Sequence, residues 1–178
     1  MTRFAALLRG INVGGKNKVS MSGLRATCAA IGLDDVQTYI QSGNVVFSSS
    51  QRSTAKLETS IEQAISDDTG LTISVMVRSA RALAQIVDHN PYASDELPAT
   101  QLVVAFLKSR PTTKALDLSD YGPETAVVRG NDVFVHYPNG QGRSKVTNAV
   151  LERLLGTPAT ARNWNTVGKL LALTSPGG

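Results

Sequence analysis

Hydrophobic and polar positions in the first half of the chain alternate between the spacing of strands and the spacing of helices. Residues 4–9 and 71–77 have the short apolar pattern of strands, and two more strands flank the turn at Gly43. Apolar residues recur at helical spacing after Ser20 and again after Ser53, two residues suited to cap a helix. The resulting order is strand, helix, strand, strand, helix, strand, with strands at 4–9, 36–40, 44–47 and 71–77. This order predicts a split βαβ, or ferredoxin-like, unit.

The second half of the chain repeats this order of elements without a detectable sequence repeat. A helix at 79–89 and a linker at 92–100 separate the two halves, and the last helix starts near Trp164. The expected elements of the second half are strands at 102–107, 125–129, 133–137 and 159–162, a short helix at 112–118 and a helix capped by Ser144. We therefore predict an α+β protein of two tandem ferredoxin-like (βαββαβ, α/β-plait) subdomains, residues 1–78 and 101–178. A connecting helix and linker, residues 79–100, would join them, and a C-terminal helix would be extra.

Composition excludes several classes of protein. The 178 residues contain one cysteine, Cys28, and two histidines, so an intramolecular disulfide is impossible and a Cys/His zinc site is disfavoured. The longest apolar run, residues 102–107, is too short to cross a bilayer, and the N-terminus lacks the apolar core of a signal peptide. We expect a cytoplasmic protein that has no membrane contact, no metal and no cofactor.

Positive charge is concentrated at the two ends of the chain. Residues 1–33 hold five basic and no acidic residues, and residues 133–178 hold five basic residues and one acidic residue. The middle, residues 34–132, holds eight basic and thirteen acidic residues. This distribution suits an anionic partner if the ends meet, although a modest imbalance also serves solubility alone.

The loop at 10–18 has the composition of an anion-binding loop. It fits G-x-x-x-x-G-K through Gly15 and Lys16, but Asn17 stands where a nucleotide-binding P-loop needs serine or threonine for magnesium. A P-loop is therefore disfavoured. Gly14 and Gly15 still allow backbone N–H groups to approach an anion, and the lysines can complete its charge. The alternative is a flexible connection in which glycine supplies positive φ.

Three further segments are candidates for a ligand site. The hairpin at 38–44 presents amide and hydroxyl groups, or is ordinary turn chemistry with Gly43 at positive φ. The segment 137–145 places glycines and Arg143 before the expected helix capped by Ser144, with Lys145 in its first turn, which suits phosphate, or is a capped helix with solvated basic residues. In the segment 160–166, Asn163 is a suitable helix cap, while Arg162 could hold a carboxylate or phosphate and Trp164 could stack on a ring.

These four segments together resemble the uncharacterised bacterial family known as domain of unknown function 1697. The resemblance rests on residues 6–17, 38–47, 142–145 and 160–166, four motifs in the right order along essentially the whole chain. It implies two α/β-plait subdomains and no established activity, so no catalytic role can be transferred.

The leading functional hypothesis is a cleft between the two subdomains that binds a phosphorylated or otherwise anionic ligand. The alternatives are nucleic-acid binding, a metal-independent enzyme that acts on a small metabolite, and a self-association module, with the oligomeric state open. No spacing identifies a nucleophile or a general base, so the sequence leaves open whether the protein is an enzyme. The candidate ligand-binding residues are Arg9, Asn12, Gly14, Gly15, Lys16, Asn17, Lys18, Tyr39, Gln41, Ser42, Asn44, Tyr137, Arg143, Ser144, Lys145, Arg162, Asn163, Trp164 and Asn165.

Overall fold

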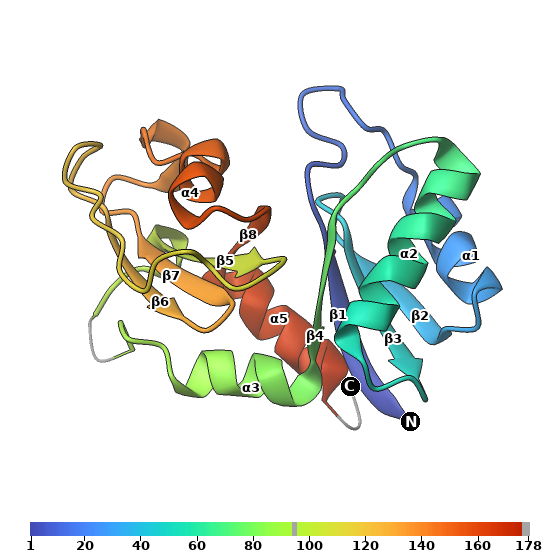
Figure 1. Cartoon of the computed structure of the whole chain (residues 1–178). Coiled ribbons are helices and arrows are strands. Elements are labelled where there is room, and N and C mark those ends of the chain that lie inside the picture. The colour runs from blue at the N-terminus through green and yellow to red at the C-terminus, as the bar shows by residue number, and fades with distance from the viewer. Residues whose placement is uncertain (94–95, 176–178) are drawn as a thin grey trace. The chain divides into compact units, whose positions relative to one another are not determined.

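The computed structural model describes residues 1–93 and 96–175, and within them the protein has an α+β fold with two four-stranded antiparallel sheets and five α-helices (Figure 1). The chain forms two compact units. Unit 1 comprises residues 1–84 together with the described end of the chain from residue 170, and unit 2 comprises residues 85–169. The end of the chain therefore belongs with the first half, where Arg3 donates a 2.9 Å hydrogen bond to the carbonyl of Leu173. Positions 94–95 of the expected linker and 176–178 of the expected second subdomain lie outside the described residues.

Unit 1 follows the predicted order of elements. Its segments are β1 (Thr2–Leu8), α1 (Met21–Ala30), β2 (Asp34–Tyr39), β3 (Asn44–Ser49), α2 (Thr54–Thr69) and β4 (Val75–Ser79). The strands pair in the order β2-β3-β1-β4, with every pair antiparallel. Ser20 and Ser53 cap the two helices as expected, by accepting hydrogen bonds from the N–H groups of Gly23 and Lys56. The last strand begins at Val75, four residues later than predicted.

The core of unit 1 lies between its sheet and the two helices, which cover the same face of the sheet (Figure 1). Alternate residues of β1 point into this core, and the Phe4 ring stacks on the ring of Phe47 from β3 at a centroid distance of 5.7 Å. Such packing fixes the register of β1, since a one-residue slip would turn its apolar side chains to the other face.

Unit 2 repeats the strand order of unit 1 with fewer helices. It contains the end of α3 (Ala80–Asp88), the 3-10 turns Ala99–Gln101 and Gln141–Arg143, β5 (Leu102–Leu107), β6 (Thr125–Arg129), β7 (Asp132–His136), α4 (Asn148–Leu155), β8 (Ala159–Asn163) and the start of α5 (Trp164–Thr174). Its sheet has the antiparallel order β6-β7-β5-β8.

The helix predicted at residues 112–118 is wrong. This segment has no helical hydrogen bonding, yet Leu118 is buried in the core of unit 2 and Leu116 and Tyr121 pack against the same core. Thr113 accepts from the N–H of Ala115, a local side-chain bond that competes with helix formation. An irregular segment thus covers the part of the core that a helix was expected to cover.

The predicted start of the next helix is also wrong. Ser144 accepts from the N–H of Val146, and helix α4 begins only at Asn148, where Thr147 is the N-cap and accepts from Val150. Val146 is completely buried, so the chain stays extended there to place this side chain in the core before the helix starts. Lys145 therefore lies ahead of the helix rather than in its first turn, as Arg143 also does.

In each sheet, glutamate side chains of a helix accept hydrogen bonds from the N–H groups of one edge strand. In unit 1, Glu58 and Glu62 of α2 accept 2.8 Å hydrogen bonds from the N–H groups of Val77 and Val75 on β4. In unit 2, Glu152 of α4 accepts a 2.7 Å bond from Ala159 on β8. Both strands lie at a sheet edge, where unpaired N–H groups would otherwise favour pairing with another chain.

Candidate functional site

Most of the candidate residues from the first half of the chain meet at one end of unit 1. Because successive elements run in opposite directions, the β1–α1 loop (residues 9–20), the β2–β3 turn (40–43) and the α2–β4 connection (70–74) emerge at the same end of the sheet (Figure 1). The main chain joins them directly. Arg9 donates from its N–H to the carbonyl of Ser74, and Leu8 donates to the carbonyl of Gly43, each at 2.9 Å.

The side chain of Asn12 holds the β1–α1 loop in shape. Its oxygen accepts from the N–H of Val19 at 2.9 Å, and its amide donates to the carbonyls of Val19 and Gln41 at 3.0 Å each. A second asparagine, Asn17, donates to the carbonyl of Gly10 at 3.0 Å. Both asparagines were expected to bind ligand, but these bonds already use their side chains to shape the loop.

The loop backbone is held in a conformation that exposes N–H groups. Asn12, Gly14, Gly15 and Asn17 all have positive φ, between 47° and 75°. The two glycines are exposed, and no chain acceptor is recorded for their N–H groups within the described residues. Successive N–H groups in such turns form concave sites for anions.

Two cations lie beside these N–H groups. Lys16 and Lys18 are exposed, and neither has an acidic partner within residues 1–93 and 96–175. Helix α1 begins at Met21, three residues after Lys18, and its first turn carries no acidic residue to neutralise the positive end of the helix dipole. Positive potential from three sources therefore converges at this end of unit 1.

A pocket of about 520 Å³ opens between the loop and the start of α1. Gly15, Lys18 and the cap residue Ser20 line one part of it, and Asn12 and Gln41 another. This volume lies within the range of ordinary small-molecule sites. A smaller pocket of about 230 Å³ adjoins it, because Lys18, Val19 and Ser20 line both.

The turn between β2 and β3 contributes less to this pocket than its sequence suggests. Gly43 has φ of 84°, the conformation expected for the hairpin. Asn44 is completely buried and donates to Tyr39 and Ser42, so its expected contact with a ligand is wrong and its role is to fix the turn. Of the expected turn residues, only Gln41 lines the pocket.

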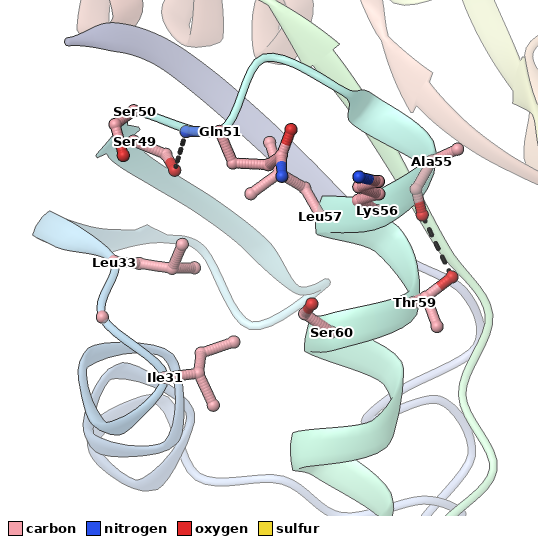
Figure 2. Close-up of a pocket in the computed structure, with 11 residues that line it drawn as sticks. Ile31, Leu33, Ser49, Ser50, Gln51, Ala55, Lys56, Leu57, Thr59 and Ser60 are labelled. Atoms are coloured by element: carbon pink, nitrogen blue, oxygen red, sulfur yellow. Dashed lines mark hydrogen bonds between the residues drawn. The ribbon is translucent and has the colours of Figure 1, made fainter.

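A larger pocket of about 590 Å³ lies at the opposite end of unit 1, between the end of α1 and the start of α2 (Figure 2). Its single charged residue is Lys56. Two of its hydroxyl groups are used within the chain, since Ser49 accepts from the N–H of Gln51 and Thr59 donates to the carbonyl of Ala55 (Figure 2). This pocket has fewer charged groups for an anion than the loop end, despite its larger volume.

The candidate residues of the third segment, in unit 2, do not form one surface. Tyr137 is completely buried, its hydroxyl donates to the carbonyl of Val146 at 3.1 Å, and burial raises its pKa to about 12. Its expected contact with a ligand is therefore wrong, because the ring is part of the core. Arg143 and Lys145 remain exposed beside Ser144, without the helix N-terminus that was expected to assist them.

The last segment serves mainly the structure of unit 2. Asn163 accepts from the N–H of Thr166 and caps α5, as predicted. Arg162 is buried and donates to Thr160 and Ala161 of its own strand, and burial lowers its pKa to about 10, so it stays charged at neutral pH. Asn165 is exposed and Trp164 is partly buried. The involvement of this segment in a cleft between the units stays a prediction.

The cysteine and histidine side chains of the described residues do not form a further reactive site. Cys28 is buried on the apolar face of α1 as expected, and burial raises its thiol pKa to about 11, which makes it a poor nucleophile. His136 bonds to Gln101 at 3.2 Å and contacts the ring of Tyr92. Over the described ranges, no three His, Cys, Asp or Glu side chains are grouped to hold a metal ion, and no helix is long and apolar enough to span a bilayer.

Sequence reasoning missed two polar residues that line the smaller pocket at the loop end. Thr27 of α1 donates to the carboxylate of Asp68 of α2 at 2.8 Å, across 41 positions of sequence. The one local signal was Asp68 itself, an acid in the last turn of a helix, where the dipole disfavours negative charge.

Comparisons with known proteins relate this chain to an uncharacterised family and to a solved structure. A sequence profile described as "Protein of unknown function (DUF1697)" matches residues 1–134. A solved structure, described as that of the conserved bacterial protein SP0830 from Streptococcus pneumoniae, is similar at 27% identity and a TM-score of 0.72, over 98% of this chain and 99% of that chain. Curated proteins give no match.

Proposed function

The chain belongs to the DUF1697 family of proteins of unknown function, and because membership assigns no activity, we propose one from the site: the loop end of unit 1 binds a phosphorylated or other anionic ligand. The observation that carries this proposal is the hydrogen-bonded β1–α1 loop, which exposes the N–H groups of Gly14 and Gly15 beside two lysines that have no acidic partner in the described part of the chain. Backbone N–H groups and lysine ammonium groups are the usual ligands of phosphate oxygens.

The proposal also includes the finer class of the fold. Each sheet has the order expected when a βαββαβ unit folds with its first and third strands in the centre, and unit 1 has both helices. These orders support a ferredoxin-like assignment for unit 1, and for unit 2 a variant in which an irregular segment replaces the first helix. In such a unit, loops that emerge together from one end of the sheet are natural places for a ligand.

Nucleic-acid binding through an aromatic sheet surface is less well supported. RNA-recognition sheets stack bases on exposed aromatic rings. All nine aromatic residues of this chain lie in the described part, and none of them is exposed: the four phenylalanines and Tyr137 are buried, and the others are partly buried. A backbone-only contact with nucleic acid would instead give a steep salt dependence with oligonucleotides.

The test is stabilisation by inorganic phosphate and pyrophosphate in thermal unfolding. At about 100 times its dissociation constant, a ligand should stabilise the protein by ~2.7 kcal/mol, and the Lys16→Ala/Lys18→Ala double variant should lose most of this gain. Lys56→Ala is the matched control, because Lys56 lines the pocket at the other end of the same unit (Figure 2).

Two results would contradict the proposal. One is full stabilisation of the double variant by both anions, and the other is loss of stabilisation in Lys56→Ala alone, which would move the site to the opposite end of unit 1.

A further inference from the structure

The two adjoining pockets at the loop end of unit 1 differ in chemical character. The larger, about 520 Å³, is lined by Gly15 and Lys18 next to the start of α1 and contains no acidic residue. The smaller, about 230 Å³, contains the carboxylate of Asp68 together with Thr27 and Thr69. Lys18 lines both pockets. This cationic residue therefore lies at the border between the larger pocket, which has no acid, and the smaller pocket, which contains the hydrogen-bond acceptor Asp68.

The carboxylate in the smaller pocket has capacity for a further hydrogen-bond donor. Oδ2 of Asp68 accepts from Thr27 at 2.8 Å, while no chain donor to Oδ1 is recorded within residues 1–93 and 96–175. The Thr27 hydroxyl also lies 3.0 Å from the carbonyl of Gly23, and its single hydrogen can serve only one of the two acceptors. Because Asp68 is exposed, a hydroxyl group of a ligand would replace water as the donor to this oxygen.

The position of Asp68 in its helix gives an independent reason to expect such a donor. Asp68 lies in the last turn of α2, beside the negative end of the helix dipole, and that turn carries no basic residue. The neighbouring Asp67 lies in the same turn, but its carboxylate accepts from Gln63 at 2.7 Å, and of the two acids only Asp68 lines the smaller pocket, although both line a third groove between α1 and α2. Asp68 is thus the acid of α2 that lines the pocket next to the proposed anion pocket.

We propose that the ligand is a phosphate ester of a polyhydroxylated compound, a sugar phosphate in the simplest case. Its phosphate occupies the Gly15–Lys18 pocket, and its hydroxyl groups donate to Asp68 in the smaller pocket. Hydroxyl groups fit better than an ammonium group, because Lys18 would repel a second cation but can donate to a hydroxyl oxygen. This inference rests on the proposed anion site and adds the class of molecule that occupies it.

The experiment measures affinities of ribose 5-phosphate, glucose 6-phosphate, inorganic phosphate and ribose by isothermal titration calorimetry. For at least one sugar phosphate, the wild-type protein should bind more tightly than it binds inorganic phosphate. Asp68→Asn, which keeps the shape of the side chain, should weaken that sugar phosphate about tenfold and leave inorganic phosphate unchanged. Asp67→Asn is the matched control and should change neither affinity.

The outcomes separate this inference from the proposed function. If inorganic phosphate binds but Asp68→Asn leaves every sugar phosphate unaffected, or if neither sugar phosphate exceeds inorganic phosphate, the sugar-phosphate assignment is wrong while the anion site stands. If no phosphate compound binds the wild-type protein, both fail. Equal weakening in Asp68→Asn and Asp67→Asn would show that the effect is not specific to the Asp68 carboxylate and would also overturn the inference.

Discussion

Replacing Gly43 by alanine is expected to lower the free energy of unfolding by about 2–4 kcal/mol, because the added methyl group strains the backbone and crowds the core. Gly43 has φ of 84°, a conformation that L-residues adopt at a cost. A Cβ atom there would also lie 2.5 Å from Cδ1 of Ile11 and 3.0 Å from Cβ of Leu8, both completely buried side chains. Backbone strain and overpacking therefore add.

Gly70→Ala is the matched control for this prediction. Gly70 ends α2 with φ of 71°, and its Cβ would meet nothing within 4 Å. This variant carries the backbone strain without the steric clash and should cost only about 1–2 kcal/mol. Urea unfolding of both variants makes the comparison, and equal losses would mean that the contact between the turn and Ile11 is not tight.

Asn12→Ala is expected to destabilise the protein by about 2–3 kcal/mol and to weaken phosphate binding at least tenfold. The substitution removes three hydrogen bonds and leaves the N–H of Val19, a residue that is only 7% exposed, without its side-chain acceptor. The loop would then sample conformations in which the glycine N–H groups diverge, so ligand binding would have to order it again.

Asn17→Ala provides the comparison for Asn12. Asn17 also has positive φ, at 47°, but its side chain makes one hydrogen bond in an exposed position. Its replacement should cost about 1 kcal/mol and reduce phosphate affinity less. Denaturant unfolding and phosphate titration of both variants test this order, and a larger effect at Asn17 would contradict the role given to Asn12.

Local signals in the sequence were sufficient for most of unit 1. Ser20 and Ser53 were recognised as helix caps and Gly43 as a turn glycine, because each acts through bonds or dihedral angles within a few residues. Both strand hairpins were likewise predicted, since alternating apolar residues and a turn glycine are local patterns.

The errors arose where distant packing determined the local structure. Residues 112–118 have apolar residues that suit a helix, but Leu118 reaches the core of unit 2 from an irregular segment. Ser144 and Thr147 are both good caps in sequence, and burial of Val146 between them decides where α4 begins. Tyr137 was a candidate ligand-binding residue beside a glycine-rich segment, yet its ring belongs to the core.

The residues of the candidate site divide in the same way, into those marked by a local pattern and those placed by contacts between distant segments. Glycines and lysines in one loop led to the anion-site hypothesis directly from the sequence. The structural use of Asn12 and the pairing of Thr27 with Asp68 depend on contacts between segments 29 and 41 residues apart, which no local pattern reports.

The most direct measurement of the central claim is a phosphate titration of the isotope-labelled protein followed by ¹H–¹⁵N NMR. If the loop end of unit 1 is the anion site, the largest shifts should occur at the amide signals of Gly14, Gly15 and Lys18. Signals around Lys56 and between Arg143 and Lys145 should change little. Shifts centred on either of those segments, or no shift at the two glycines with saturating phosphate, would contradict the account.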